Sequence, residues 1–183
     1  AFSASCLMLA VIGLGCSPDS KPVPSPSRAE PSALIVPIDL KEAALTRGGE
    51  IVRQTGTALS GVLLEAIRAG GLTNALPLCS VQAIPLTSSL AQANKVQLRR
   101  VSHRPRNPAN RADEQEIALI QQYQSTLSAD RQLRPISRMG QNGAVTFYAP
   151  IVIKTNLCLN CHGVSSDTLA SEIVPLLEDL YPA

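Results

Sequence analysis

The fold of this chain is constrained most by the order of its hydrophobic patterns: helical spacing comes first, and the alternation typical of strands follows. Apolar residues recur at helical spacing from Asp39, which is placed to cap a helix, to about Ala69. Gly48-Gly49 weakens the middle of this helix and Gly70-Gly71 ends it. Later segments alternate between apolar and polar residues, as strands do. Helices that lead into antiparallel strands predict an α+β domain, and 183 residues are enough for one domain with its own core.

The remaining elements follow from the same reading of spacing and turn residues. Asn142-Gly143 is a good hairpin turn between two strands. The last helix is expected either to be interrupted at Pro175 or to begin late there. The expected helices are 74–83, 85–93, 113–127 and 166–180, and the expected strands are 96–102, 132–138 and 144–153.

The first 16 residues carry no charge and are mostly apolar or small. They are fewer than the about 20 residues that cross a bilayer, and they fit the apolar core and small-residue end of a secretory signal that lacks its basic start. A buried strand or helix is the structural alternative. Leu14-Gly15-Cys16-Ser17 also resembles a lipobox, which predicts either a lipid anchor at Cys16 or simple cleavage there. Residues 17–34 are rich in Pro and Ser and predict an extended tether, so the folded domain is expected over 35–183, in the periplasm.

Cys158, Cys161 and His162 form a C-x-x-C-H run, the pattern to which c-type haem is attached. Two thiols add to the two vinyl groups of one porphyrin, so they must lie a short, fixed distance apart. The adjoining histidine then supplies an imidazole ligand to the iron. Attachment takes place on the exported side of the membrane, in agreement with the signal-like start of the chain.

Three other interpretations of the cysteines stay open. A zinc site could combine Cys79 with the C-x-x-C-H residues, although no second close pair of ligands supports it. A thioredoxin-like pair is expected near the start of a domain rather than at its end. A plain disulfide is common in exported proteins.

The second axial ligand is less determined, because His103, Cys79 and Met139 are nearly equal candidates from the residues alone. Methionine would raise the potential of the iron, and a thiolate would lower it. Five arginines crowd the region around His103: Arg99, Arg100, Arg104, Arg106 and Arg111. They are either a solvated face or, at Arg106 in particular, partners of the haem propionates. A net charge of +2 and 3% aromatic residues speak against a nucleic-acid partner.

Three segments in this order carry a family resemblance: LCSVQAIPL around Cys79, RVSHRPRNPANRADEQE from residue 100, and YAPIVIKTNLCLNCHG from residue 148. Over residues 38–183 the chain resembles the cyanobacterial Tll-type c-haem domains, a family of unknown function. The resemblance implies a PAS-like antiparallel sheet with flanking helices and haem attached at Cys158 and Cys161. It also implies axial ligation by His162 and by the Cys79 thiolate. His103 departs from the family, which often has an apolar residue there, and a further strand would be expected at the C-terminus.

These observations predict an exported domain with one covalently attached haem c that acts in one-electron transfer or in redox or ligand sensing and is not an enzyme. A peroxidase is disfavoured because the chain offers no distal acid–base pair beyond His103. The alternative is an exported binding module stabilised by zinc or a disulfide. The sequence names no redox or signalling partner, although the long first helix could pair with a second copy of the chain.

Overall fold

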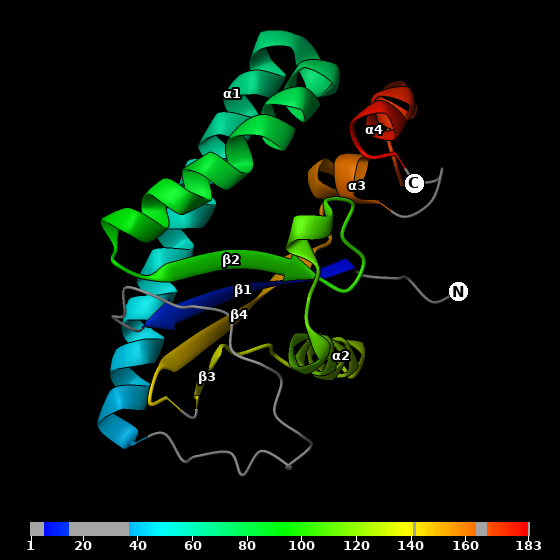
Figure 1. Ribbon diagram of the computed structural model, residues 1–183. Helices are drawn as coiled ribbons and strands as arrows, with labels where there is room; N and C mark the ends of the chain where they lie inside the picture. Colours follow the sequence, from blue (N-terminus) through cyan, green and yellow to red (C-terminus); the bar gives the residue numbers. More distant parts are fainter. Residues whose placement is uncertain (1–5, 15–36, 141, 164–167, 183) are drawn as a thin grey trace.

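The fold is known from a computed structural model that describes residues 6–14, 37–140, 142–163 and 168–182. Four strands form one antiparallel sheet in the order β2-β1-β4-β3 (Figure 1). The strands are β1 (Cys6–Leu14), β2 (Gln97–Ser102), β3 (Ile136–Met139) and β4 (Val145–Ile153). The helices are α1 (Ile38–Ala93), α2 (Glu114–Ser128), α3 (Asn156–His162) and α4 (Val174–Leu180), with 3-10 turns at Pro108–Asn110 and Ser171–Ile173. The predicted α+β class is confirmed.

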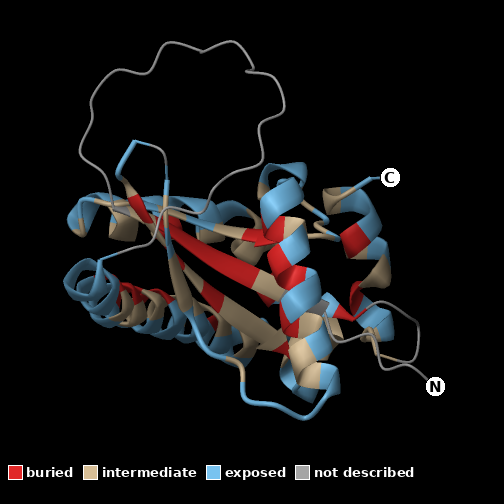
Figure 2. Ribbon diagram, turned by 90° about the horizontal axis from the view of Figure 1, so that it is seen from below, coloured by how far each residue is buried: buried red, intermediate tan, exposed pale blue. Residues whose placement is uncertain are grey.

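Helices cover both faces of the sheet, and the central strand β1 is apolar on both sides for that reason. On β1, Leu9 and Val11 face α2, whereas Ala10 and Ile12 face α1. Figure 2 shows the buried residues along the strands and on the helix faces that turn towards them. A separate small cluster joins α1 to the 3-10 turn at Ser171–Ile173 and to α4, around Leu76.

Helix α1 is folded back on itself, as Figure 1 shows. Its first arm (38–69) and second arm (72–93) meet at Gly70 and Gly71, which leave helical geometry; Gly71 has a φ of 73°, a conformation that favours glycine. The Arg47 Nη2 donates to the Asn94 carbonyl at 2.7 Å, so the end of the second arm lies beside the start of the first. The predicted break at Gly70-Gly71 is therefore confirmed.

Two details of the helix prediction are wrong. The helix begins after Pro37, which makes no side-chain cap, and Asp39 lies in the first turn, where a carboxylate favours the helix dipole. The two short helices expected over 74–83 and 85–93 are one arm that continues through Pro77 and Pro85. Packing of this arm against the rest of the molecule outweighs the local cost of proline.

The N-terminal segment lies in the sheet, which changes the predicted domain boundary at residue 35. Strand β1 pairs with β2 on one side and with β4 on the other, and its residues Leu9 to Ile12 are buried. An uncharged apolar run suits both the core of a secretory signal and a strand buried on two faces, so its composition does not separate the two. The predicted tether and the lipobox cysteine, Cys16, fall outside the described residues.

The later elements agree with the prediction apart from their ends. Asp113 caps α2 in a capping box with Glu116, and Gly143 has the positive φ of 75° that its turn requires. Strand β3 starts at Ile136, directly after Pro135, which cannot donate to a strand ladder. The last helix begins late, with Pro175 in its first turn, as expected. In the described part of the chain, no helix is long and apolar enough to cross a membrane.

Candidate functional site

The C-x-x-C-H run lies on the short helix α3, which follows β4 directly. Thr155 caps the helix: its Oγ1 accepts from the Cys158 N–H at 3.4 Å and donates to the Cys158 Sγ at 3.0 Å. A helical spacing of three places Cys158 and Cys161 on neighbouring positions of one face. His162 ends the helix, and the Gly163 N–H bonds back to the Leu159 carbonyl at 2.8 Å. Thr155 is not among the predicted site residues, although a Thr directly before a helix is a recognisable cap.

Cys79, Cys158 and Cys161 are free thiols and half-buried. A disulfide among them is therefore absent from this part of the chain. Nor do the described residues bring three His, Cys, Asp or Glu side chains together in a group able to hold a metal ion. The closed four-ligand cage of a structural zinc site is not formed by Cys79 and the C-x-x-C-H residues.

Cys79 lies on the second arm of α1, in the same neighbourhood as α3. Burial raises the pKa of the Cys161 thiol, the charge of Cys79 raises it further, and Arg106 opposes the shift. Burial raises the pKa of the Cys79 thiol, and the nearby Arg100 guanidinium acts in the opposite direction. Cys161 also packs on the apolar cluster around Leu76, three residues before Cys79. The fold thus brings Cys79 close to the C-x-x-C-H run, although the two are far apart in the sequence.

His162 is held in its neutral form. Burial of the ring and then the charges of the Arg106 and Arg100 guanidinium groups lower the pKa of the imidazole to about 4, although part of the residue is exposed to solvent. At neutral pH its ring nitrogens therefore include a free lone pair, which a metal ligand requires.

Arg106 contacts α3 from the loop that follows β2. Its Nη1 donates to the carbonyl of Cys161, and its Nη2 donates to the carbonyl of Gly163 at 2.9 Å. These acceptors belong to the end of a helix, where carbonyls lack helical partners and a cation is favoured.

The predicted cluster of arginines does not act as one group. Arg99 and Arg100 point to opposite faces of β2, as neighbours on a strand do. The Arg99 Nη2 lies 2.5 Å from Glu116 Oε1 and 3.6 Å from Asp113 Oδ2, on the side of α2. Arg100 instead lies towards Cys79 and His162, and burial lowers its pKa.

His103 and Met139, the other candidate ligands, lie at opposite ends of the sheet. Met139 pairs with Val145 at the start of β4, whereas α3 follows Ile153 at its end. At about 3.3 Å per residue, the length of β4 separates Met139 from α3 by roughly 25 Å. Met139 is therefore not placed to share an iron with His162.

His103 follows Ser102, at the end of the sheet that carries α3. Its Nδ1 is buried and has no hydrogen-bond partner among the described residues. Burial, and then the charge of Arg104, lowers its pKa. His103 thus remains a second nearby donor beside Cys79.

Tyr181 is a neighbour of the site that the sequence analysis missed. It packs on the cluster around Leu76 and Cys161, and burial and the charge of Cys79 raise the pKa of its hydroxyl. No local pattern near the C-terminus signals this placement, because it depends on how α4 docks onto α1.

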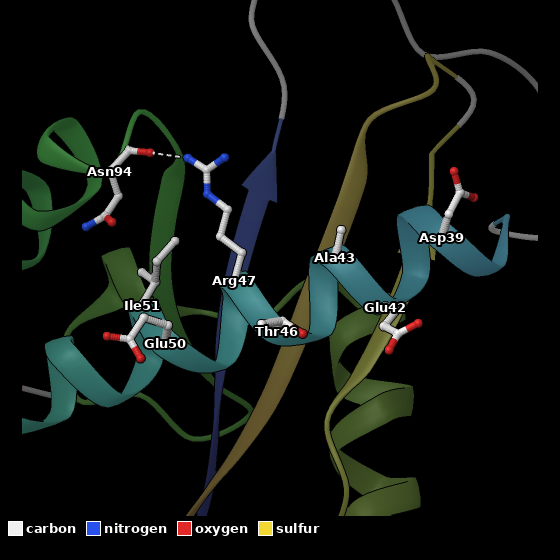
Figure 3. A pocket seen from close by; sticks show the side chains of 8 residues that line it. All are labelled: Asp39, Glu42, Ala43, Thr46, Arg47, Glu50, Ile51 and Asn94. Atoms are coloured by element: carbon white, nitrogen blue, oxygen red, sulfur yellow. Dashed lines mark hydrogen bonds between the residues drawn. The ribbon is translucent and has the colours of Figure 1, made fainter.

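A shallow depression elsewhere is not part of this arrangement. It lies between the first arm of α1 and Asn94, and Figure 3 shows Arg47 crossing it to the Asn94 carbonyl. Its acidic side chains, Asp39, Glu42 and Glu50, are those of a solvated helix face. It is at the start of β2, the end of the sheet away from α3.

Comparisons with known proteins place the chain in one family. No curated protein and no solved structure matches it. The family model of Tll0287-like domains matches residues 30–181, which is most of the chain and includes Cys79, His103, Arg106 and α3. The chain belongs to the Tll0287-like family.

Proposed function

We propose that this protein is a c-type cytochrome domain that carries one haem c, bound through the Cys158 and Cys161 thiols, with His162 as an axial ligand. The observation that carries the proposal is the C-x-x-C-H run on one capped helix, with both thiols free. Haem c would supply one-electron chemistry, and the protein would use it for electron transfer or redox sensing rather than for turnover of a substrate. The PAS-like architecture that the family resemblance implies is part of this proposal.

The donor set near α3 fits such a group. Two half-buried thiols lie on one helical face, and the neighbouring imidazole is neutral at pH 7. Beside Cys161 lies an apolar wall made by residues of α1 and of the C-terminal region, such as Leu72 and Leu169. A porphyrin is mostly apolar, so a wall of this kind offers it a surface to pack against.

We further propose Cys79 as the second axial ligand. Cys79 lies close enough to Cys161 for its charge to raise the pKa of that thiol. Burial raises the pKa of the Cys79 thiol itself and Arg100 partly opposes this rise, so binding to iron would have to stabilise the thiolate, the form in which sulfur binds. His103 is the competing donor, because its buried Nδ1 lacks a partner in the described residues. An anionic thiolate would give the protein a low potential.

Export of the protein also remains a proposal, supported by the chemistry of haem attachment and by the signal-like N-terminal segment. Because Cys6–Leu14 is a strand of the sheet, a protein from which a signal peptase has removed this segment cannot keep the same sheet. Mass determination of the N-terminus of protein recovered from the periplasm would decide between them. A protein that keeps residues 6–14 retains the strand, and one that starts at Cys16 has rebuilt its sheet.

Production of the chain with a c-type maturation system tests the attachment. We expect intact-mass analysis to show the polypeptide plus one covalently bound haem, and we expect Cys158→Ala and Cys161→Ala each to lose one thioether bond. Cys79→Ser serves as the matched control, because it removes a thiol of the same neighbourhood that attaches nothing. Recovery of the bare polypeptide mass from fully matured material would refute the proposal.

A second experiment tests the axial ligand once haem is attached. Cys79→Ser is expected to alter the absorption spectrum and raise the potential, whereas His103→Ala is expected to leave both unchanged. If His103→Ala changes the ligation and Cys79→Ser does not, His103 is the ligand and the assignment of Cys79 is wrong.

A further inference from the structure

The loop between β2 and α2 is fixed on both sides of Arg106. Before it, the Arg104 N–H donates to the Ser102 Oγ at 3.1 Å. After it, the Asn107 Oδ1 accepts from the Ala109 N–H at 2.9 Å and caps the 3-10 turn. The Ala112 N–H then returns to the Ser102 carbonyl at 3.0 Å. Arg106 therefore extends from a loop that is closed onto the end of β2.

The guanidinium of Arg106 spans the last turn of α3. The carbonyls that it binds, those of Cys161 and Gly163, belong to the residues on either side of His162. A planar guanidinium can donate from two nitrogens to two separate acceptors, whereas the ammonium of lysine is a single point of charge. The contact joins the sheet, through the β2 loop, to the backbone that carries the imidazole.

We propose that Arg106 is a positioning residue, which holds the backbone on both sides of His162 and thereby fixes the direction of the imidazole. It would act on the peptide carbonyls and not through a haem propionate. The effect on iron ligation rests on the proposed function, but the effect on α3 does not. From the sequence, haem propionates are one possible partner of Arg106, and the two roles predict different results.

The first test uses the chain without haem and compares Arg106→Gln, Arg106→Lys and Arg104→Gln by amide hydrogen exchange. Arg104 is an exposed neighbour on the same loop and serves as the control. Since hydrogen bonds to a charged group are worth more than neutral ones, we expect exchange at His162 and Gly163 to become about tenfold faster in both Arg106 variants. Unchanged exchange in Arg106→Gln relative to Arg104→Gln would overturn the proposal, and so would full rescue by lysine.

The second test uses the matured protein and reads the axial ligation from its absorption spectrum and reduction potential. Both Arg106 variants are expected to change the ligand-sensitive bands, because neither can bridge the two carbonyls, and Arg104→Gln is expected to change nothing. A propionate partner would instead tolerate lysine and leave the haem-free helix unaffected, which would refute the positioning role. If wild-type protein attaches no haem, the proposed function fails, and hydrogen exchange still decides whether Arg106 holds α3.

Discussion

Replacing Gly48 with alanine tests how closely α1 packs on the sheet. A Cβ at this position would lie 2.3 Å from Phe147 Cγ and 2.6 and 2.7 Å from the two adjacent ring carbons. Phe147 is fully buried in the cluster between α1 and β4, so its ring has little room to move aside. Overpacking of this kind costs about 1–3 kcal/mol, and a contact this short belongs at the upper end. Alanine improves helix propensity by about 1 kcal/mol, which leaves a net loss of about 2 kcal/mol.

Gly49 provides the matched control, because a Cβ there would meet no atom within 4 Å. Gly49→Ala should gain the same helix propensity without the overlap and become more stable by up to about 1 kcal/mol. The two variants should differ in stability by about 3 kcal/mol. For a chain of this size each kcal/mol shifts the midpoint of thermal unfolding by about 2–4 °C, so the two midpoints should differ by roughly 6–12 °C. Equal stabilisation by both substitutions would show that Gly48 does not lie on Phe147 and that the placement of α1 is wrong.

Three further predictions address the sheet, its ion pair and its pH dependence. A chain that starts after residue 16 lacks β1, and burial of Leu9, Val11 and Ile12 alone stabilises the fold by about 5–9 kcal/mol, so denaturant titration should find the shortened chain unfolded. An unfolding midpoint equal to that of the full chain would mean that β1 contributes nothing to stability. Glu116→Ala should cost about 1–3 kcal/mol, because the carboxylate is 2% exposed and serves both Arg99 and the α2 cap; Glu114→Ala, at an exposed position of the same turn, should change stability little. Burial raises the pKa of Tyr123 to about 12, above the 10 of the unfolded chain, so the folded form keeps its proton longer and stability falls as the pH rises from 10 to 12. The loss should reach about 2–3 kcal/mol, and the same titration of Tyr123→Phe should lack it.

Local chemistry accounts for the parts of the fold that could be predicted. The break at Gly70-Gly71 and the turn at Gly143 each depend on residues a few positions apart, and each is confirmed. The position of residues 6–14 could not be predicted, because an apolar segment satisfies a signal peptide and a central strand equally well. The choice depends on pairing with β2 and β4, which are remote in the sequence.

The candidate site shows the same division between local and distant information. The C-x-x-C-H spacing is local and is recognised in the sequence, whereas the short helix α3 that carries Cys158, Cys161 and His162 is not among the expected elements. That Cys79 lies near α3 while Met139 lies at the far end of the sheet follows from the fold of α1 and from strand register. No spacing rule in the sequence distinguishes Cys79 from Met139 as a ligand, whereas the register of β3 on β4 places Met139 too far from α3.

The position of β1 between two later strands also sets the order in which the protein can assemble. One partner strand comes from the middle of the chain and the other from its last quarter, so neither pairing can form while the ribosome is still making the first arm of α1. Contacts this distant in sequence close late and make folding slow. Throughout that interval the apolar N-terminal segment stays accessible to chaperones, and a delay in translation would extend the same interval.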